Sequence, residues 1–132
     1  MKIRVILADD HRIMREGLKL LLTKYNDIDI IADASNGNDA VELCRSLHPD
    51  IVILDIQMPR LSGIEACKII KREFPEIKVI ILSMYSDRKI VEETMTSGAQ
   101  GYLLKDCAFE ELHEAIYDIF GGKKYMSQEI AA

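Results

Sequence analysis

The sequence lacks the cysteine pattern of a disulfide framework or of a zinc site. Its three cysteines, Cys44, Cys67 and Cys107, lie far apart and form no Cys-x-x-Cys pair. Separated cysteines in odd number are typical of a protein from a reducing compartment whose thiols are buried. We therefore expect a cytoplasmic protein without disulfides. The histidines show no ligand spacing that would indicate a metal site.

Long apolar runs and clusters of basic charge are also missing. The N-terminal run Ile3–Ala8 contains Arg4 and meets two aspartates, so it is too short and too charged for a signal peptide. No later run is long enough to span a bilayer. The net charge is −5 and the lysines and arginines are scattered. We expect neither a membrane nor a nucleic acid as a direct partner of this chain.

What remains is the composition of one folded domain, with 132 residues of which 48% are hydrophobic and 30% charged. Short β-branched runs alternate with longer segments of helical periodicity. The expected strands are Ile3–Ala8, Ile28–Ala34, Ile51–Leu54, Val79–Leu82 and Gly101–Leu104. The expected helices lie near Ile13–Leu22, Gly37–Leu47, Ile64–Phe74, Asp87–Ser97 and Phe109–Ile119.

The spacing of the strands predicts the fold class. Their first residues recur every 22 to 28 positions, which is the spacing of βαβ units with parallel strands and right-handed crossovers. A closed eightfold barrel would need about twice this length. The sequence therefore predicts an α/β protein with a doubly wound, five-stranded parallel sheet and helices on both faces.

Polar side chains follow the strands where each strand ends. Asp9 and Asp10 follow the first strand, Asp55 the third, Ser83 the fourth and Lys105 the fifth. Ligands of open parallel sheets bind beyond the carboxyl ends of the strands. We therefore expect these five side chains to converge at one edge of the sheet.

Crowded carboxylates repel and desolvate one another unless a cation is present. Mg²⁺ prefers carboxylate and water oxygens and bridges readily to phosphate. Lys105 would add a second positive charge and Ser83 a hydroxyl donor, so the set could neutralise a phosphoryl group during transfer to a carboxylate. The alternative, that Asp9 and Asp10 only cap a helix, accounts for neither Asp55 nor Lys105.

These residues carry a resemblance to a known family. The segments Ala8–His11, Leu54–Pro59, Leu82–Ser83 and Tyr102–Lys105, together with Gly63, resemble the receiver domain of two-component response regulators. The resemblance covers about residues 2 to 122, and the stretch 98–106 is most similar to the NarL/FixJ type. It implies the flavodoxin-like strand order 2-1-3-4-5.

The resemblance implies a role for each acidic residue. Asp55 would accept a phosphoryl group from a sensor histidine kinase. Asp9, Asp10 and Asp55 would hold Mg²⁺, to which Gln57 would add its backbone carbonyl. The chain would then be no enzyme in the usual sense, because it catalyses only its own phosphorylation and dephosphorylation.

The resemblance also implies a switch. Ser83 and Lys105 would contact the phosphoryl oxygens, and Tyr102 would turn from a more exposed rotamer into space that Ser83 vacates. The region Asp87–Phe120 would then change and control self-association, as a homodimer, or docking of an output domain. Asp106 departs from the many receivers that have proline after the lysine, which leaves the loop geometry near Lys105 undetermined.

The expected domain organisation is a receiver over residues 1–122 and the start of a linker over 123–132. In the full-length protein we expect a helix-turn-helix DNA-binding output domain in cis that regulates transcription. A stand-alone or degenerate receiver serving only as an interaction module remains the alternative. A flavodoxin-like electron carrier would need a phosphate loop where the chain has Asp9–Arg12, and a phosphatase would need an aspartate at His11.

Overall fold

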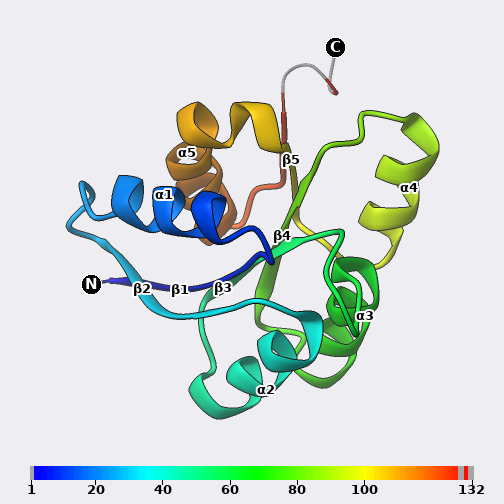
Figure 1. Cartoon of the computed structure of the whole chain (residues 1–132), viewed down its shortest axis with the longest axis horizontal. Helices are drawn as coiled ribbons and strands as arrows, with labels where there is room; N and C mark the ends of the chain where they lie inside the picture. Colours follow the sequence, from blue (N-terminus) through cyan, green and yellow to red (C-terminus); the bar gives the residue numbers. More distant parts are fainter. Residues whose placement is uncertain (1, 128–129, 131–132) are drawn as a thin grey trace.

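The computed structural model describes residues 2–127 and 130. Strands and helices alternate along the chain (Figure 1). The strands are β1 (Ile3–Ala8), β2 (Ile28–Ala34), β3 (Ile51–Asp55), β4 (Lys78–Ser83), β5 (Gly101–Leu104) and β6 (Tyr125–Met126). The helices are α1 (Arg12–Leu22), α2 (Gly37–Leu47), α3 (Gly63–Glu73), α4 (Arg88–Thr96) and α5 (Ala108–Phe120). A 3₁₀ turn, Lys105–Cys107, joins β5 to α5.

Both faces of the sheet are buried, which is why the central strands are apolar without interruption. On β1, Val5 and Leu7 pack on the side of α1 and α5. Ile6 and Ala8 alternate with them and pack on the side of α2, α3 and α4. Figure 1 shows α1 and α5 together on one face. The predicted α/β class, with helices on both faces of a parallel sheet, is confirmed.

Within the described residues the sheet has six strands in the order β2-β1-β3-β4-β5-β6, so the predicted count of five is wrong. The added strand, β6, pairs parallel to β5. The amide of Tyr125 donates to the carbonyl of Gln100, and the amide of Ser127 donates to the carbonyl of Tyr102. A strand of two residues is too short to produce a periodic pattern, so no pattern in the sequence indicates it.

The prediction that a linker begins at residue 123 stays a prediction. Part of it, residues 128, 129, 131 and 132, lies outside the described residues. The side chains of Cys44 and Cys67 are buried, as expected, whereas Cys107 is partly exposed. Across residues 2–127 and 130, every helix is too short or too polar to cross a membrane.

One glycine fixes how α3 meets the end of β3. A Cβ atom on Gly63 would lie 2.1 Å from the carbonyl oxygen of Asp55, a distance that no side chain can occupy. The Gly63 amide donates to the carbonyl of Ile56 at 2.8 Å. The first turn of α3 therefore lies directly against the backbone that presents the Asp55 side chain.

Candidate functional site

Three charged side chains meet in the interior at the carboxyl edge of the sheet. Asp9 is fully buried after β1, and Asp55 is 3% exposed at the end of β3. The ammonium of Lys105 lies 2.9 Å from Oδ2 of Asp55 and 3.3 Å from Oδ2 of Asp9. The prediction that these strand ends converge is confirmed for the three residues. Two carboxylates around one ammonium leave one negative charge uncompensated, which is costly in a buried place.

Asp9 and Asp10 differ in their surroundings. Oδ1 of Asp9 accepts a hydrogen bond from the amide of His11 at 2.8 Å. Within the part of the chain that the structure describes, Oδ2 of Asp9 is the one buried side-chain polar atom without a hydrogen bond. The Asp10 side chain is 37% exposed. One ligand atom from each of Asp9, Asp10, His11 and Asp55 can be chosen so that all lie within 4.8 Å of one another. This acidic pocket, with a buried carboxylate oxygen that makes no hydrogen bond, fits a hard divalent cation.

The environment of Asp55 changes its acidity. The pKa of its carboxyl group is raised from 3.8 to about 6, chiefly by burial and also by the nearby charge of Asp9. The hydrogen bond from Lys105 opposes both effects. Asp55 is therefore mostly ionised at neutral pH but more basic than an ordinary aspartate, which suits a nucleophile.

Gln57 lies at the mouth of the same pocket. Its backbone amide donates to Oδ1 of Asp55 at 3.3 Å, while its side-chain amide donates to the Tyr85 hydroxyl. These bonds join the loop after β3 to the loop after β4. Lys105 donates to one carboxylate oxygen of Asp55 and Gln57 donates to the other, so the two bonds fix the orientation of the carboxylate.

Ser83 and Tyr102 both bond to the backbone of Tyr85. The Ser83 hydroxyl oxygen accepts from the Tyr85 amide at 2.9 Å, and the Tyr102 hydroxyl donates to the Tyr85 carbonyl at 2.6 Å. Tyr102 is fully buried, and this burial raises the pKa of its hydroxyl. The sequence-based expectation started the switch from a more exposed Tyr102 rotamer, whereas the structure has the ring inside. The reason is the Tyr85 carbonyl, which provides a hydrogen-bond acceptor inside the protein.

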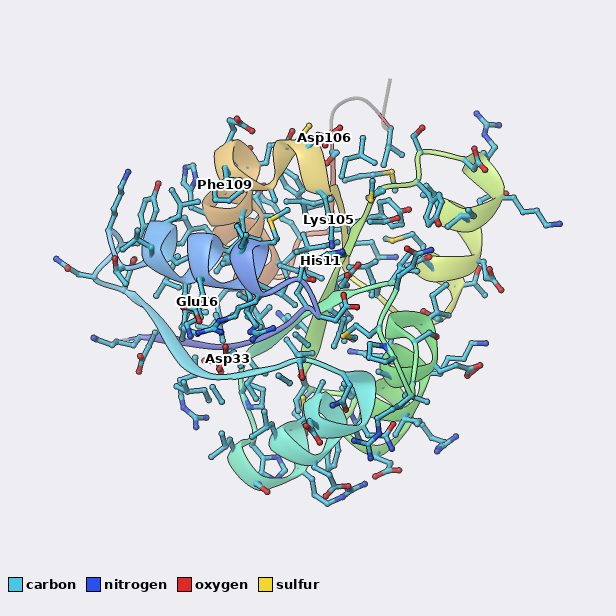
Figure 2. The ribbon with its side chains drawn as sticks, in the orientation of Figure 1. His11, Glu16, Asp33, Lys105, Asp106 and Phe109 are labelled. Carbon is cyan, nitrogen blue, oxygen red and sulfur yellow. The ribbon has the colours of Figure 1, made fainter. Side chains whose placement is uncertain are left out.

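Two residues of the site, His11 and Tyr85, were not assigned to it from the sequence. His11 is distant from Lys105 in the sequence, yet its Nδ1 lies 2.9 Å from the ammonium of Lys105 (Figure 2). The position of His11 directly after Asp9 and Asp10 is a signal for its place in the site, whereas the spacing between the histidines is not. Tyr85 carried no signal, because its contacts with Ser83 and Tyr102 depend on the path of a loop.

Comparison with known proteins identifies the family. The family model of the response regulator receiver domain matches residues 5–117. The chain belongs to this family. The receiver domain is 38% identical over 130 residues to the transcriptional regulatory protein LnrK of Bacillus subtilis, covering 98% of this chain and 59% of that protein. It is 36% identical over 129 residues to the response regulator UvrY of Escherichia coli K12, with 98% and 59% covered.

A solved structure supports the same assignment. The crystal structure of a LuxR-family two-component response regulator from Aurantimonas sp. SI85-9A1 matches with a TM-score of 0.94 and 33% identity. That match covers 99% of this chain and 94% of the other. The receiver domain spans 55% to 60% of the length of curated relatives that it matches. Receiver domains are parts of signalling proteins and not of metabolic enzymes, and those of this family bind Mg²⁺ at an acidic pocket.

Proposed function

We propose that this receiver domain takes up a phosphoryl group on Asp55 and thereby switches the protein of which it is a part. The observation that carries the proposal is the buried Asp55 carboxylate, with one oxygen bonded by Lys105 at 2.9 Å and a pKa of about 6. A structural ion pair would instead hold the pKa of an aspartate below its usual value.

The proposed step is an in-line displacement at phosphorus. An oxygen of Asp55 forms the new bond, the bond from phosphorus to the leaving group breaks, and the leaving group departs with the electron pair. For a sensor histidine kinase that leaving group is an imidazole nitrogen, which then takes a proton from water. Lys105 neutralises charge on the transferred group, and the amide of Gln57 holds the other carboxylate oxygen in place.

Asp9, Asp10 and Asp55 are the residues that would hold Mg²⁺, with the backbone carbonyl of Gln57 as a further ligand. The bound ion would supply positive charge toward the phosphoryl oxygens. The buried Oδ2 of Asp9, which no hydrogen bond reaches, supports this assignment.

Ser83, Tyr85 and Tyr102 are the proposed switch. If the Ser83 hydroxyl turns toward a phosphoryl oxygen, it gives up the amide of Tyr85, and the loop after β4 then keeps the bonds of Tyr85 with the Tyr102 hydroxyl and the Gln57 side chain. The loop and the buried ring are therefore expected to shift together, and with them the surface Asp87–Phe120. That surface would control formation of a homodimer or docking of an output domain in cis.

For the full-length protein we propose a regulator of transcription controlled by a sensor histidine kinase. The support is that relatives of this chain include the transcriptional regulatory protein LnrK, and that the chain covers 59% of its length. The remaining part would contain the helix-turn-helix output domain, with the receiver over residues 1–122 and a linker from residue 123.

Incubation with acetyl phosphate and Mg²⁺ tests the proposal. We expect one acid-labile phosphoryl group per chain by mass spectrometry, and none on Asp55→Asn. The matched control is Asp50→Asn, since Asp50 directly precedes β3 at the opposite edge and accepts from the amide of Arg4. Labelling of Asp55→Asn equal to that of the unsubstituted protein would contradict the assignment. If neither the unsubstituted protein nor Asp55→Asn is labelled, the result favours the alternative of a degenerate receiver that serves only as an interaction module.

A further inference from the structure

We propose that the acidic pocket is also a binding site for borderline divalent ions such as Ni²⁺ and Co²⁺, with Nδ1 of His11 as a ligand. The inference rests on the proposed function for the carboxylate ligands, and it adds a nitrogen ligand with a different preference for metals. It concerns which ions the pocket selects.

The geometry places the imidazole among the carboxylates. Nδ1 of His11 lies 3.1 Å from Oδ1 of Asp9, 3.4 Å from Oδ1 of Asp10 and 3.7 Å from Oδ2 of Asp55. Distances of this size between ligand atoms are those found around one metal ion, whose bonds to nitrogen and oxygen are about 2.0–2.2 Å long. The ring therefore needs no large movement to share an ion with the carboxylates.

Nδ1 of His11 lies between a donor and an acceptor. The lysine ammonium, which has only donors, lies 2.9 Å from it, and Oδ1 of Asp9, which only accepts, lies 3.1 Å from it. The tautomer with its proton on Nε2 leaves a lone pair on Nδ1 for the ammonium, and that lone pair is also what a metal ion requires.

The Lys105 ammonium already has the surroundings of a bound cation. Its Nζ atom contacts Oδ2 of Asp55, both carboxylate oxygens of Asp9 and Nδ1 of His11, which makes three oxygens and one nitrogen. The Asp9 oxygen is buried and has no hydrogen bond, so part of its electrostatic demand is unmet by the protein. A divalent ion would meet that demand more fully than a single ammonium shared among three groups.

The chemistry of the donors determines the preference. Carboxylates alone favour hard ions such as Mg²⁺, whereas imidazole suits the later first-row metals, whose affinities rise from Mn²⁺ through Co²⁺ to Ni²⁺. The His11 side chain is 59% exposed, so its ring can turn toward an ion that enters from solvent. We expect Mg²⁺ to leave the ring unliganded and Ni²⁺ to recruit it.

The test measures metal affinity by calorimetry, without a phosphodonor, for Mg²⁺, Mn²⁺, Co²⁺ and Ni²⁺. His11→Gln should weaken Ni²⁺ binding by at least about tenfold. Loss of a residue that only orients a metal ligand already lowers metal affinity by about that factor, and loss of the ligand itself costs no less. Mg²⁺ affinity should change by less than about twofold, because Mg²⁺ prefers oxygen. His48→Asn is the matched control, since His48 is an exposed histidine remote from the pocket.

The inference is overturned if His11→Gln leaves Ni²⁺ affinity unchanged, if it weakens Mg²⁺ and Ni²⁺ equally, or if His48→Asn weakens Ni²⁺ as much. X-ray absorption of the Ni²⁺ complex gives a second readout, with imidazole scattering that His11→Gln should remove. Failure here is distinct from failure of the proposed function. Asp55 can still be phosphorylated with Mg²⁺ when His11→Gln leaves Ni²⁺ affinity unchanged. Equally, His11 can bind Ni²⁺ in a protein whose Asp55 takes up no phosphoryl group.

Discussion

The two edges of the sheet treat their charges in opposite ways. At the amino edge three charged groups, those of Arg4, Asp50 and Lys78, each have a partner of their own. The guanidinium of Arg4 donates to the carbonyl of His48 at 2.7 Å, and the ammonium of Lys78 donates to the carbonyl of Ile119 at 3.0 Å. The carboxylate of Asp50 accepts from the amide of Arg4 at 2.8 Å. At the carboxyl edge, Asp9 and Asp55 share the single ammonium of Lys105.

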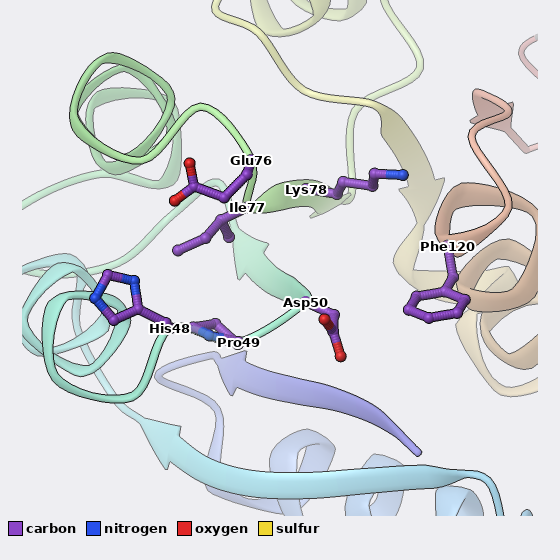
Figure 3. A pocket seen from close by; sticks show the side chains of 7 residues that line it. All are labelled: His48, Pro49, Asp50, Glu76, Ile77, Lys78 and Phe120. Atoms are coloured by element: carbon purple, nitrogen blue, oxygen red, sulfur yellow. The ribbon is translucent and has the colours of Figure 1, made fainter. Parts of the chain in front are cut away.

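Shape alone does not distinguish the two edges. Asp50, Lys78 and Phe120 line a pocket at the amino edge (Figure 3). His11, Lys105 and neighbouring residues line another at the carboxyl edge. The difference is that the carboxyl edge has more buried carboxylates than ammonium groups, whereas the charged groups named at the amino edge show no such excess. Uncompensated charge is therefore a better guide to the functional edge than the presence of a hollow.

Two lysines give the sharpest test of this comparison. Lys105→Met should slow the labelling of Asp55 by acetyl phosphate by about a hundredfold or more, because it removes a charge that stabilises the transferring group. Lys78→Met should leave the labelling rate unchanged and lower the free energy of unfolding by about 1 kcal/mol, through loss of one hydrogen bond. Mass spectrometry over time in saturating Mg²⁺ measures the rates. Similar rates for the two variants would break the comparison.

Two glycines test how rigidly the carboxyl edge is built. Gly63→Ala should lower the free energy of unfolding by about 3 kcal/mol, because its Cβ would lie 2.1 Å from the Asp55 carbonyl oxygen. Gly121→Ala, at the amino edge, should change it by less than about 0.5 kcal/mol, because its Cβ meets nothing closer than 3.4 Å. Urea denaturation measures both. Equal losses would mean that the approach of α3 to Asp55 is not special.

The raised pKa of Asp55 predicts a dependence of stability on pH. The folded protein holds this proton up to about pH 6 and the unfolded chain only to about 3.8, so ionisation of Asp55 disfavours the fold. The contribution of Asp55 to stability should fall between about pH 4 and 6 and stay constant above. In chelator, Asp55→Asn should match the unsubstituted protein at pH 4 and exceed it by on the order of 2 kcal/mol at pH 7.

The measurement is urea denaturation of both proteins across that range. Addition of Mg²⁺ should reduce the difference at pH 7, since the ion binds the folded carboxylates and offsets their repulsion. A constant difference at all pH values would show that Asp55 is not destabilised by its surroundings.

The smallest expected effect concerns the support behind Lys105. The hydroxyl of Ser127 accepts from the buried amide of Leu104 at 2.9 Å, one residue before the lysine. Ser127→Ala should cost about 1–2 kcal/mol in unfolding free energy, because that amide loses its partner. Thr23→Ala, which removes an exposed hydroxyl bond at the end of α1, should cost less than about 0.5 kcal/mol. Equal costs would show that the segment after α5 does not support the site.

The sequence predicted the parts of the fold that depend on apolar periodicity. Strands β1, β2 and β5 were predicted with the bounds that they have, and the predicted ends of β3 and β4 came within one residue. The strand ends also revealed Asp9, Asp55 and Lys105, because parallel strands of one sheet present their carboxyl ends together. Register and topology were enough for these residues.

What the sequence did not reveal depends on contacts without a period. Strand β6 forms because residues 125–127 meet the free edge of β5, and neither side has a local pattern that indicates the pairing. The ring of His11 and the backbone of Tyr85 belong to the site through loop paths. Loop paths are determined by tertiary packing, which periodicity does not encode.

Strand β6 has a further consequence for solubility. Strand β5 is buried on both faces, and a free edge of such a strand is a template for pairing with another chain. At the opposite end of the sheet, β2 carries Asp29 and Asp33, whose charges discourage such pairing. Strand β5 has no charged residue, so the two-residue strand takes over that protective role. A fragment that ends before Tyr125 would expose a short apolar strand edge and with it a tendency to aggregate.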